Sequence, residues 1–223
     1  MKKRDYNSIL EICFNICIVI FAGIGTYLMW SNTESGAGLM SSGFANLKYF
    51  TVLSNLFCGA VALIRLIFFA LSKKFSVLPK LMAASATGLT FFIIAAFLQP
   101  LYPDLNLYER GNLYFHLIVP LLSVADFLII KTGDKIPFRY TLYSASLALI
   151  YGTGYLVNIL VNGIGEWPES NDWYGFLNWG FPIGIAIFAF VVVMEFGIAC
   201  LLRFLNYRIN KLRRKNENSN PDK

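Results

Sequence analysis

Charged residues are scarce in this 223-residue chain: Asp, Glu, Lys and Arg make up 14% of it, against about a quarter in a soluble domain. Hydrophobic residues make up 57%. The few charges are clumped, which leaves several apolar stretches, each of roughly twenty residues and long enough to cross a bilayer as a helix. These features exclude an ordinary soluble domain and predict an all-α, polytopic membrane protein.

Residues that bind metals or cofactors are scarce as well. The chain has one histidine and four cysteines, and all four cysteines fall within the apolar stretches, so neither a zinc site nor a disulfide framework is expected. Every lysine lies at a span boundary or in a loop, which argues against a buried Schiff-base lysine. A Gly-rich phosphate loop and an internal repeat are both missing from the sequence, and the second absence argues against an inverted-repeat transporter. We therefore expect no metal and no cofactor.

Six spanning helices are predicted, at residues 9–30, 48–71, 78–99, 112–130, 138–162 and 176–203. The first follows MKKRDYNSILE, but it is longer than a signal-peptide core, so we interpret it as a retained span. Basic residues gather before the first span, in the second and fourth connections and after the last span, whereas the other connections are acidic or balanced. The positive-inside rule therefore predicts that both termini are cytosolic.

A single domain is expected, because the connections are too short to fold alone. We assign residues 1–205 to a six-helix transmembrane domain and residues 206–223 to a basic cytosolic tail that frays into disorder. The net charge of +6 could suggest a nucleic acid partner. Because the basic residues mostly flank the spans, we expect lipid headgroups as partners instead, and no nucleic acid.

Polar side chains within the spans separate into two layers by depth, and each is a candidate for function because burial in lipid is costly. Thr51 and Asn55 share one helix face near the outer surface, and His116 lies at a similar depth in the fourth span. Three further amides are predicted at that level: Gln99, Asn158 and Asn162.

The inner layer contains Arg65, Asp126 and Glu195. Opposite charges at related depth in neighbouring helices predict an ion-paired clamp, in which Arg65 pairs with Asp126, Glu195 or both. A proton path is the functional alternative, but no chain of titratable groups joins the two layers in the sequence.

His116 precedes Pro120 by four residues. Proline has no backbone N–H, so it frees the carbonyl of His116, and the helix should bend there and open space around the imidazole. A reacting histidine would use that space. A kink filled by a packed histidine is an equally weighted alternative on spacing alone.

A hydroxyl becomes a useful nucleophile when an imidazole takes its proton. His116 is the sole imidazole, and Thr51 is the hydroxyl at matching depth. Asn55, Asn158 or Asn162 could then donate to a developing oxyanion. The opposing interpretation is that a buried threonine usually bonds to its own backbone.

Three segments in this order, NLKYFTVLSNLF, FHLIVPLL and GTGYLVNILVNGIGEWP, resemble the integral-membrane hydrolases of fatty acid esters of hydroxy fatty acids, the androgen-induced and androgen-dependent membrane protein family with its bacterial relatives. The similarity runs from the second span to the sixth. It implies a Thr/His catalytic pair on Thr51 and His116, a lipid ester as substrate, and an integral, multi-pass location in a bacterial plasma membrane. The chain departs from the family in having Ser54-Asn55 where an acid can occur, and in a shorter segment between the pair.

Two other functions stay open at this point. A membrane acyltransferase would share the acyl-enzyme step, with Cys58 as an alternative nucleophile, although deep burial disfavours its thiolate. A non-catalytic lipid-binding or transport protein is the third possibility. A continuous polar lining from face to face would favour transport, and the sequence leaves a gap between its two polar layers.

Overall fold

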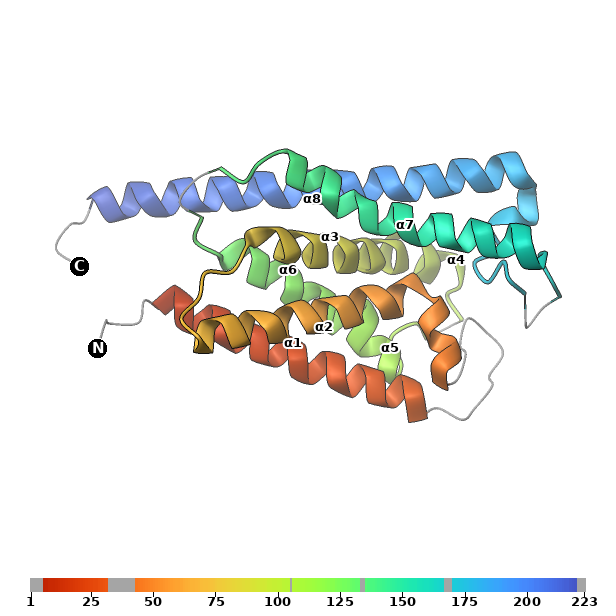
Figure 1. The fold of residues 1–223 in the computed structure, drawn as a ribbon, viewed down its shortest axis with the longest axis horizontal. Coiled ribbons are helices and arrows are strands. Elements are labelled where there is room, and N and C mark those ends of the chain that lie inside the picture. Colours follow the sequence, from red (N-terminus) through yellow and green to blue (C-terminus); the bar gives the residue numbers. More distant parts are fainter. Residues whose placement is uncertain (1–5, 32–42, 105, 133–134, 167–169, 220–223) are drawn as a thin grey trace.

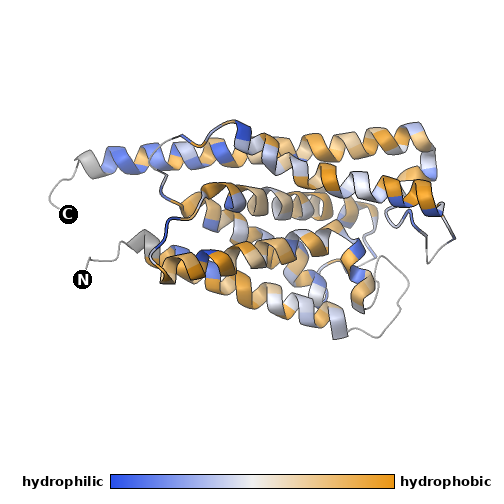
Figure 2. Cartoon of the chain, viewed as in Figure 1, coloured by the Kyte–Doolittle hydropathy of each residue, from blue (hydrophilic) through white to orange (hydrophobic). Residues whose placement is uncertain are grey.

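The computed structural model describes residues 6–31, 43–104, 106–132, 135–166 and 170–219, and these residues are helical with short connections. Among these described residues, six helices are long and apolar enough to cross a membrane, which confirms the predicted fold class. They span Ile9–Ser31, Phe50–Ala70, Val77–Leu101, Gly111–Ile129, Arg139–Asn162 and Phe181–Asn216. Hydrophobic residues cover the helices along most of their length, and hydrophilic residues gather at the ends (Figure 2).

The axes of the helices are roughly aligned, successive spans alternate in direction, and together they form a bundle around α3 (Figure 1). Helix α1 is Tyr6–Ser31, α2 is Phe50–Ala70, α3 is Val77–Ile93, α6 is Val119–Ile129, α7 is Arg139–Asn162 and α8 is Phe181–Ser219. Shorter elements connect them: η1 (Gly43–Lys48), η2 (Ile94–Leu98), α4 (Gln99–Leu101), α5 (Gly111–Leu113), η3 (Tyr114–Ile118) and η4 (Phe176–Trp179).

Helix α3 lies between two groups of helices. It packs against α2 and α6 on one side and against α7 and α8 on the other, while α1 packs against α2 and α6. Its buried stretch from Ala83 to Gly88 is made of small residues, which allow backbones to approach closely. Gly152 likewise lets α7 and α8 pack closely. A Cβ at this position would lie 1.7 Å from the ring of Phe188 in α8, so a larger residue would clash with that ring.

The bundle has two chemically different ends. Helix α1 begins and α8 ends at one end, together with the α2–α3 and α6–α7 connections, and we call this the terminal end (Figure 1). The opposite end carries a cluster of aromatic residues around Tyr49, Tyr151 and Tyr174, and we call it the aromatic end. The predicted orientation places the terminal end in the cytosol.

Cysteine labelling should verify that orientation. Lys73 and Glu166 are exposed residues at the terminal and aromatic ends, respectively. On intact cells, a membrane-impermeant maleimide is expected to label Glu166→Cys at once and Lys73→Cys only after permeabilisation. The unaltered chain, whose four native cysteines lie within spans, provides the background. The reverse labelling pattern would invert the topology.

Residues 206–219 depart from the expected disordered tail, because α8 continues as a helix to Ser219. The Asn206 amide donates to the carbonyls of Phe127 and Ile130 at 3.0 and 3.2 Å, and Asn210 donates to Ile130 at 3.1 Å. The last carbonyls of a helix have no partner within that helix. This part of α8 therefore caps α6 and belongs to the packed bundle.

Candidate active site

His116 lies in a π-helical turn, η3, immediately before α6. Here the backbone N–H of Val119 bonds to the carbonyl of Tyr114, five residues back rather than four. The ring of Pro120 would crowd the His116 carbonyl in a regular α-helix, and the wider turn moves that carbonyl aside. A second π-helical turn, η2, precedes Pro100, and there the backbone N–H of Gln99 bonds to the carbonyl of Ile94. Turns of this kind often occur at functional sites.

The imidazole of His116 is held by one backbone group. Its Nδ1 lies 2.5 Å from the carbonyl oxygen of Leu107, and the side chain is 7% exposed. A carbonyl can only accept, so Nδ1 must carry the proton. Nε2 then keeps its lone pair, and it makes no hydrogen bond to any residue that the structure describes. The bond to Leu107 therefore sets the tautomer that a general base requires.

Thr51 is the second residue of α2 and is half-buried. Its hydroxyl forms no hydrogen bond within the described part of the chain. The other six threonines in that part all use theirs, and five of them bond to the carbonyl three or four residues back: Thr26, Thr87, Thr90, Thr141 and Thr153. The usual behaviour of a buried threonine thus does not apply to Thr51.

Asn55 joins the turn of Thr51 to the turn of His116. Its Nδ2 donates to the Thr51 carbonyl at 2.7 Å and to the Phe115 carbonyl at 3.0 Å, and the side chain is fully buried. Phe115 is seated against Gly25 of α1, where a Cβ would lie 2.6 Å from its ring. Thr51 and His116 are not hydrogen-bonded to each other, which is common before a substrate aligns the groups.

The expected role of Asn55 as an oxyanion donor is not supported by this geometry. Both N–H bonds of its amide already point at carbonyls, and the remaining atom, Oδ1, is a buried acceptor without a donor. An acceptor cannot stabilise a negative oxygen. Asn55 is therefore a positioning residue.

The other predicted oxyanion candidates do not converge with Thr51 and His116. Asn162 donates to Asn158, and Asn158 donates to Asn171 in the α7–α8 connection, at 2.8 and 3.0 Å. Asn162 is also exposed. These amides fasten that connection to the end of α7. Gln99 is half-buried at the aromatic end of the α3–η2–α4 span, and no hydrogen bond from it to Thr51 or His116 is present.

The α7–α8 connection covers the start of α2, a contact that no pattern in the sequence predicts. Tyr174 accepts a hydrogen bond from the Phe50 backbone N–H at 2.9 Å, and Tyr151 donates to the Lys48 carbonyl at 2.5 Å. Trp173 donates to the Tyr151 hydroxyl at 3.1 Å. Burial raises the pKa of the Tyr174 hydroxyl well above its usual range, so it stays protonated as a neutral partner.

A carboxylate does not complete a triad among the described residues. Asp104 and Glu166 lie in connections at the aromatic end and are both exposed, and the position beside His116 Nδ1 is taken by the Leu107 carbonyl. The buried acid of this region, Asp172, accepts instead from the Tyr155 hydroxyl and from two backbone N–H groups at the start of η4. Trp167, in the third of the segments that carry the family resemblance, lies outside the described residues.

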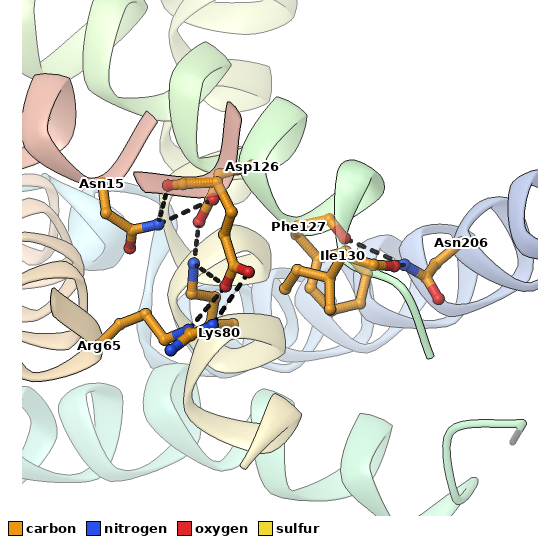
Figure 3. Close-up of polar contacts among 8 residues, drawn as sticks. Asn15, Arg65, Lys80, Asp126, Phe127, Ile130 and Asn206 are labelled. Carbon is orange, nitrogen blue, oxygen red and sulfur yellow. Dashed lines mark hydrogen bonds and ion pairs between the residues drawn. The ribbon is translucent and has the colours of Figure 1, made fainter. Parts of the chain in front are cut away.

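Charged residues gather near the terminal end, but in pairs that differ from the prediction (Figure 3). Arg65 binds both carboxylate oxygens of Glu11, at 2.7 and 3.0 Å. Lys80 pairs with Asp126 at 2.5 Å and lies 3.4 Å from Glu11. The expected pairing of Arg65 with Asp126 or Glu195 is therefore wrong. Lys80, assigned from the sequence to a span boundary, is 4% exposed inside the bundle.

Glu195 lies apart from this cluster. It is fully buried in α8, and its Oε2 accepts from the Ala148 backbone N–H of α7 at 2.9 Å. Its Oε1 has no hydrogen-bond partner, and no cation pairs with it in the described ranges. The reason is its place in the bundle, because α8 packs on the far side of α3 from α1 and α2.

A groove between α1 and α2 does not contain the candidate residues. It has a volume of about 530 Å³, lies between α1 and α2, and is lined by apolar and small residues such as Ala22, Gly59 and Ala60. Ala60 follows Thr51 by nine residues, which places it half a turn around the helix. The groove therefore opens on a different face of α2.

The fold and these features define the chain as a multi-pass helical membrane protein. No family model, curated protein or solved structure gives a significant match to it.

Proposed function

We propose that the protein is a membrane-embedded lipid-ester hydrolase in which Thr51 is the nucleophile and His116 is the general base. The observation that carries this proposal is the bond from His116 Nδ1 to the Leu107 carbonyl, which leaves Nε2 free to take a proton. The unbonded hydroxyl of Thr51 supports it, as does the link through Asn55 between the two turns. The resemblance of the three sequence segments to the hydroxy-fatty-acid ester hydrolases independently selects the same two residues.

The reaction would proceed in two steps. His116 Nε2 takes the proton of Thr51 Oγ1 as that oxygen attacks the ester carbonyl, and the imidazolium then returns the proton to the departing alkoxide. A water molecule, deprotonated by the same imidazole, then attacks the acyl-threonine. The bond from the acyl carbon to Thr51 Oγ1 breaks, the imidazolium returns the proton to that oxygen, and the fatty acid leaves. The developing oxyanion would lie at the N-terminus of α2, near the backbone N–H of Thr51. That group is the remaining donor of the first turn, because the N–H of Phe50 bonds to Tyr174 and those of Val52 and Leu53 bond to the Tyr49 carbonyl.

A long-chain acyl ester suits the position of this site. Thr51 is at the aromatic end of its span, close to where ester linkages lie in a bilayer, and the surrounding helices are apolar. The substrate's acyl chains would lie between helices, and its ester at the polar layer. The resemblance favours esters of hydroxy fatty acids and a bacterial plasma membrane.

Labelling with a lipophilic fluorophosphonate probe tests the proposal directly, because such probes modify activated hydroxyls. Purified protein is expected to be labelled, and Thr51→Ala is expected to lose the label. Thr153→Ala is the matched control, since Thr153 is an exposed threonine whose hydroxyl bonds to its own helix. Equal labelling of Thr51→Ala and the unaltered protein would end the proposal.

A further inference from the structure

A small cavity lies beside the charged cluster and is lined by residues of α1, α2, α3 and α6. Its volume is about 10 Å³, close to the space that a single water molecule needs. Apolar residues such as Ala62 and Ala83 line part of it. The cavity lies within the predicted spans, so whatever it binds lies inside the membrane region of the protein.

The remaining lining is polar and comes from three helices. Asn15 of α1, Lys80 of α3, and Ser123 and Asp126 of α6 all border the cavity, and each is at most 4% exposed. Apolar cavities in proteins stay dry, whereas a polar cavity of sufficient size holds water. The lining therefore points to a polar occupant.

The hydrogen bonds of these groups indicate which kind of molecule the cavity can bind. Asn15 Nδ2 donates to Asp126 at 3.0 Å and to the Glu11 carbonyl at 2.6 Å, but its Oδ1 is buried and accepts nothing. Lys80 has three N–H bonds and pairs with two carboxylates, Asp126 and Glu11. One acceptor and one donor thus remain to be satisfied at the same cavity.

The charge balance excludes a metal ion as the occupant. Glu11 and Asp126 carry two negative charges, and Arg65 and Lys80 carry two positive ones. A further cation would lie next to the Lys80 ammonium in a medium of low dielectric constant, at a large cost. The occupant must be neutral, must donate to Asn15 and must accept from Lys80.

We propose that this cavity binds one water molecule, which accepts a hydrogen bond from Lys80 and donates one to Asn15 Oδ1. The water exchanges with the terminal end past the Glu11–Arg65 pair, whose side chains are 15% and 19% exposed. It also extends the polar contacts of the cluster to Ser123 and Cys58, which border the same cavity. Ser123 follows His116 by seven residues, a rise of about 10 Å along the helix axis.

Radiolytic footprinting can detect such a water in the intact protein, because X-ray pulses generate hydroxyl radicals from water in place. Cys58 is a suitable reporter, since its side chain is 2% exposed and borders the cavity. We expect Cys58 to be oxidised in the unaltered protein despite its burial, with the new oxygen coming from ¹⁸O-labelled water. Oxidation should fall several-fold in Ala62→Val, whose added methyl groups occupy the cavity.

Ala22→Val is the matched control. Ala22 is a buried alanine of the neighbouring α1, but it borders the α1–α2 groove and not this cavity. It is expected to leave Cys58 oxidation unchanged. Equal oxidation of Cys58 in the unaltered protein and in a folded Ala62→Val variant would overturn the proposal.

A crystal structure of the unaltered protein, at a resolution that shows ordered water, provides a second readout should Ala62→Val fail to fold. Density within hydrogen-bonding distance of both Asn15 Oδ1 and Lys80 Nζ is the expected result. Well-ordered side chains with no density between them would contradict the proposal.

Discussion

Thr51→Ala and His116→Ala are each expected to lower kcat for a long-chain ester on the order of 10³-fold or more, and the double variant by little more than either single one. General-base assistance alone contributes about 10²- to 10⁴-fold. Two residues that act as one unit do not add, because the nucleophile is weak without its base and the base is idle without its nucleophile. The measurement is hydrolysis of a long-chain p-nitrophenyl or hydroxy-fatty-acid ester by purified protein in detergent.

Two conservative variants separate chemistry from folding. Thr51→Ser keeps the hydroxyl and should keep part of the activity. Thr153→Ala removes an exposed threonine that bonds to its own helix and should leave the rate unchanged. An active protein whose turnover survives both Thr51→Ala and His116→Ala would return His116 to the role of a packed residue that fills the turn before Pro120.

The fold could be predicted because membrane helices must be long and apolar. The predicted spans at 48–71 and 138–162 match α2 and α7 within two residues at each end. The last span was predicted to end at 203, yet α8 runs to Ser219. Composition alone shows that residues 206–219 are polar. It does not show that the amides of Asn206 and Asn210 donate hydrogen bonds to carbonyls at the end of α6.

Both polar layers were predicted from depth along a helix, and depth brings residues together only where their helices are neighbours. It selected Thr51 and His116, whose turns are joined through Asn55. It failed for Glu195, which lies at a suitable depth but across α3 from Arg65. Sequence gives the depth of a residue directly, whereas the neighbours of a helix follow from packing.

One signal for the correct partners was present in the sequence and was missed. Glu11 and Asn15 are spaced by four in the first span, so they share a helix face. Both point at the charged cluster, where Glu11 meets Arg65 and Asn15 meets Asp126. A glutamate placed one turn inside a spanning helix is itself an indication of a buried partner.

Lys80→Met is expected to be the most destabilising single change in the charged cluster, lowering the free energy of unfolding by about 3–5 kcal/mol. The Lys80 side chain is 3% exposed, and its ammonium lies 2.5 Å from Asp126. Removing it leaves a buried carboxylate whose one remaining side-chain donor, among the residues that the structure describes, is the Asn15 amide. Reversible unfolding in mixed detergent micelles, followed by circular dichroism, measures the change.

The double variant Lys80→Met/Asp126→Leu should lose less stability than Lys80→Met alone, because replacing both members of a buried pair by apolar groups removes the cost of an unpaired charge. Arg65→Met is the matched control: the Arg65 and Glu11 side chains are 19% and 15% exposed, so water can partly solvate the glutamate left behind, and Lys80 still lies 3.4 Å away. Its loss should be smaller than that of Lys80→Met. Equal losses of stability in Lys80→Met and the double variant would contradict this prediction. They would mean that the buried Asp126 carboxylate does not need the Lys80 ammonium, and that their contact does not hold α3 against α6 at the terminal end.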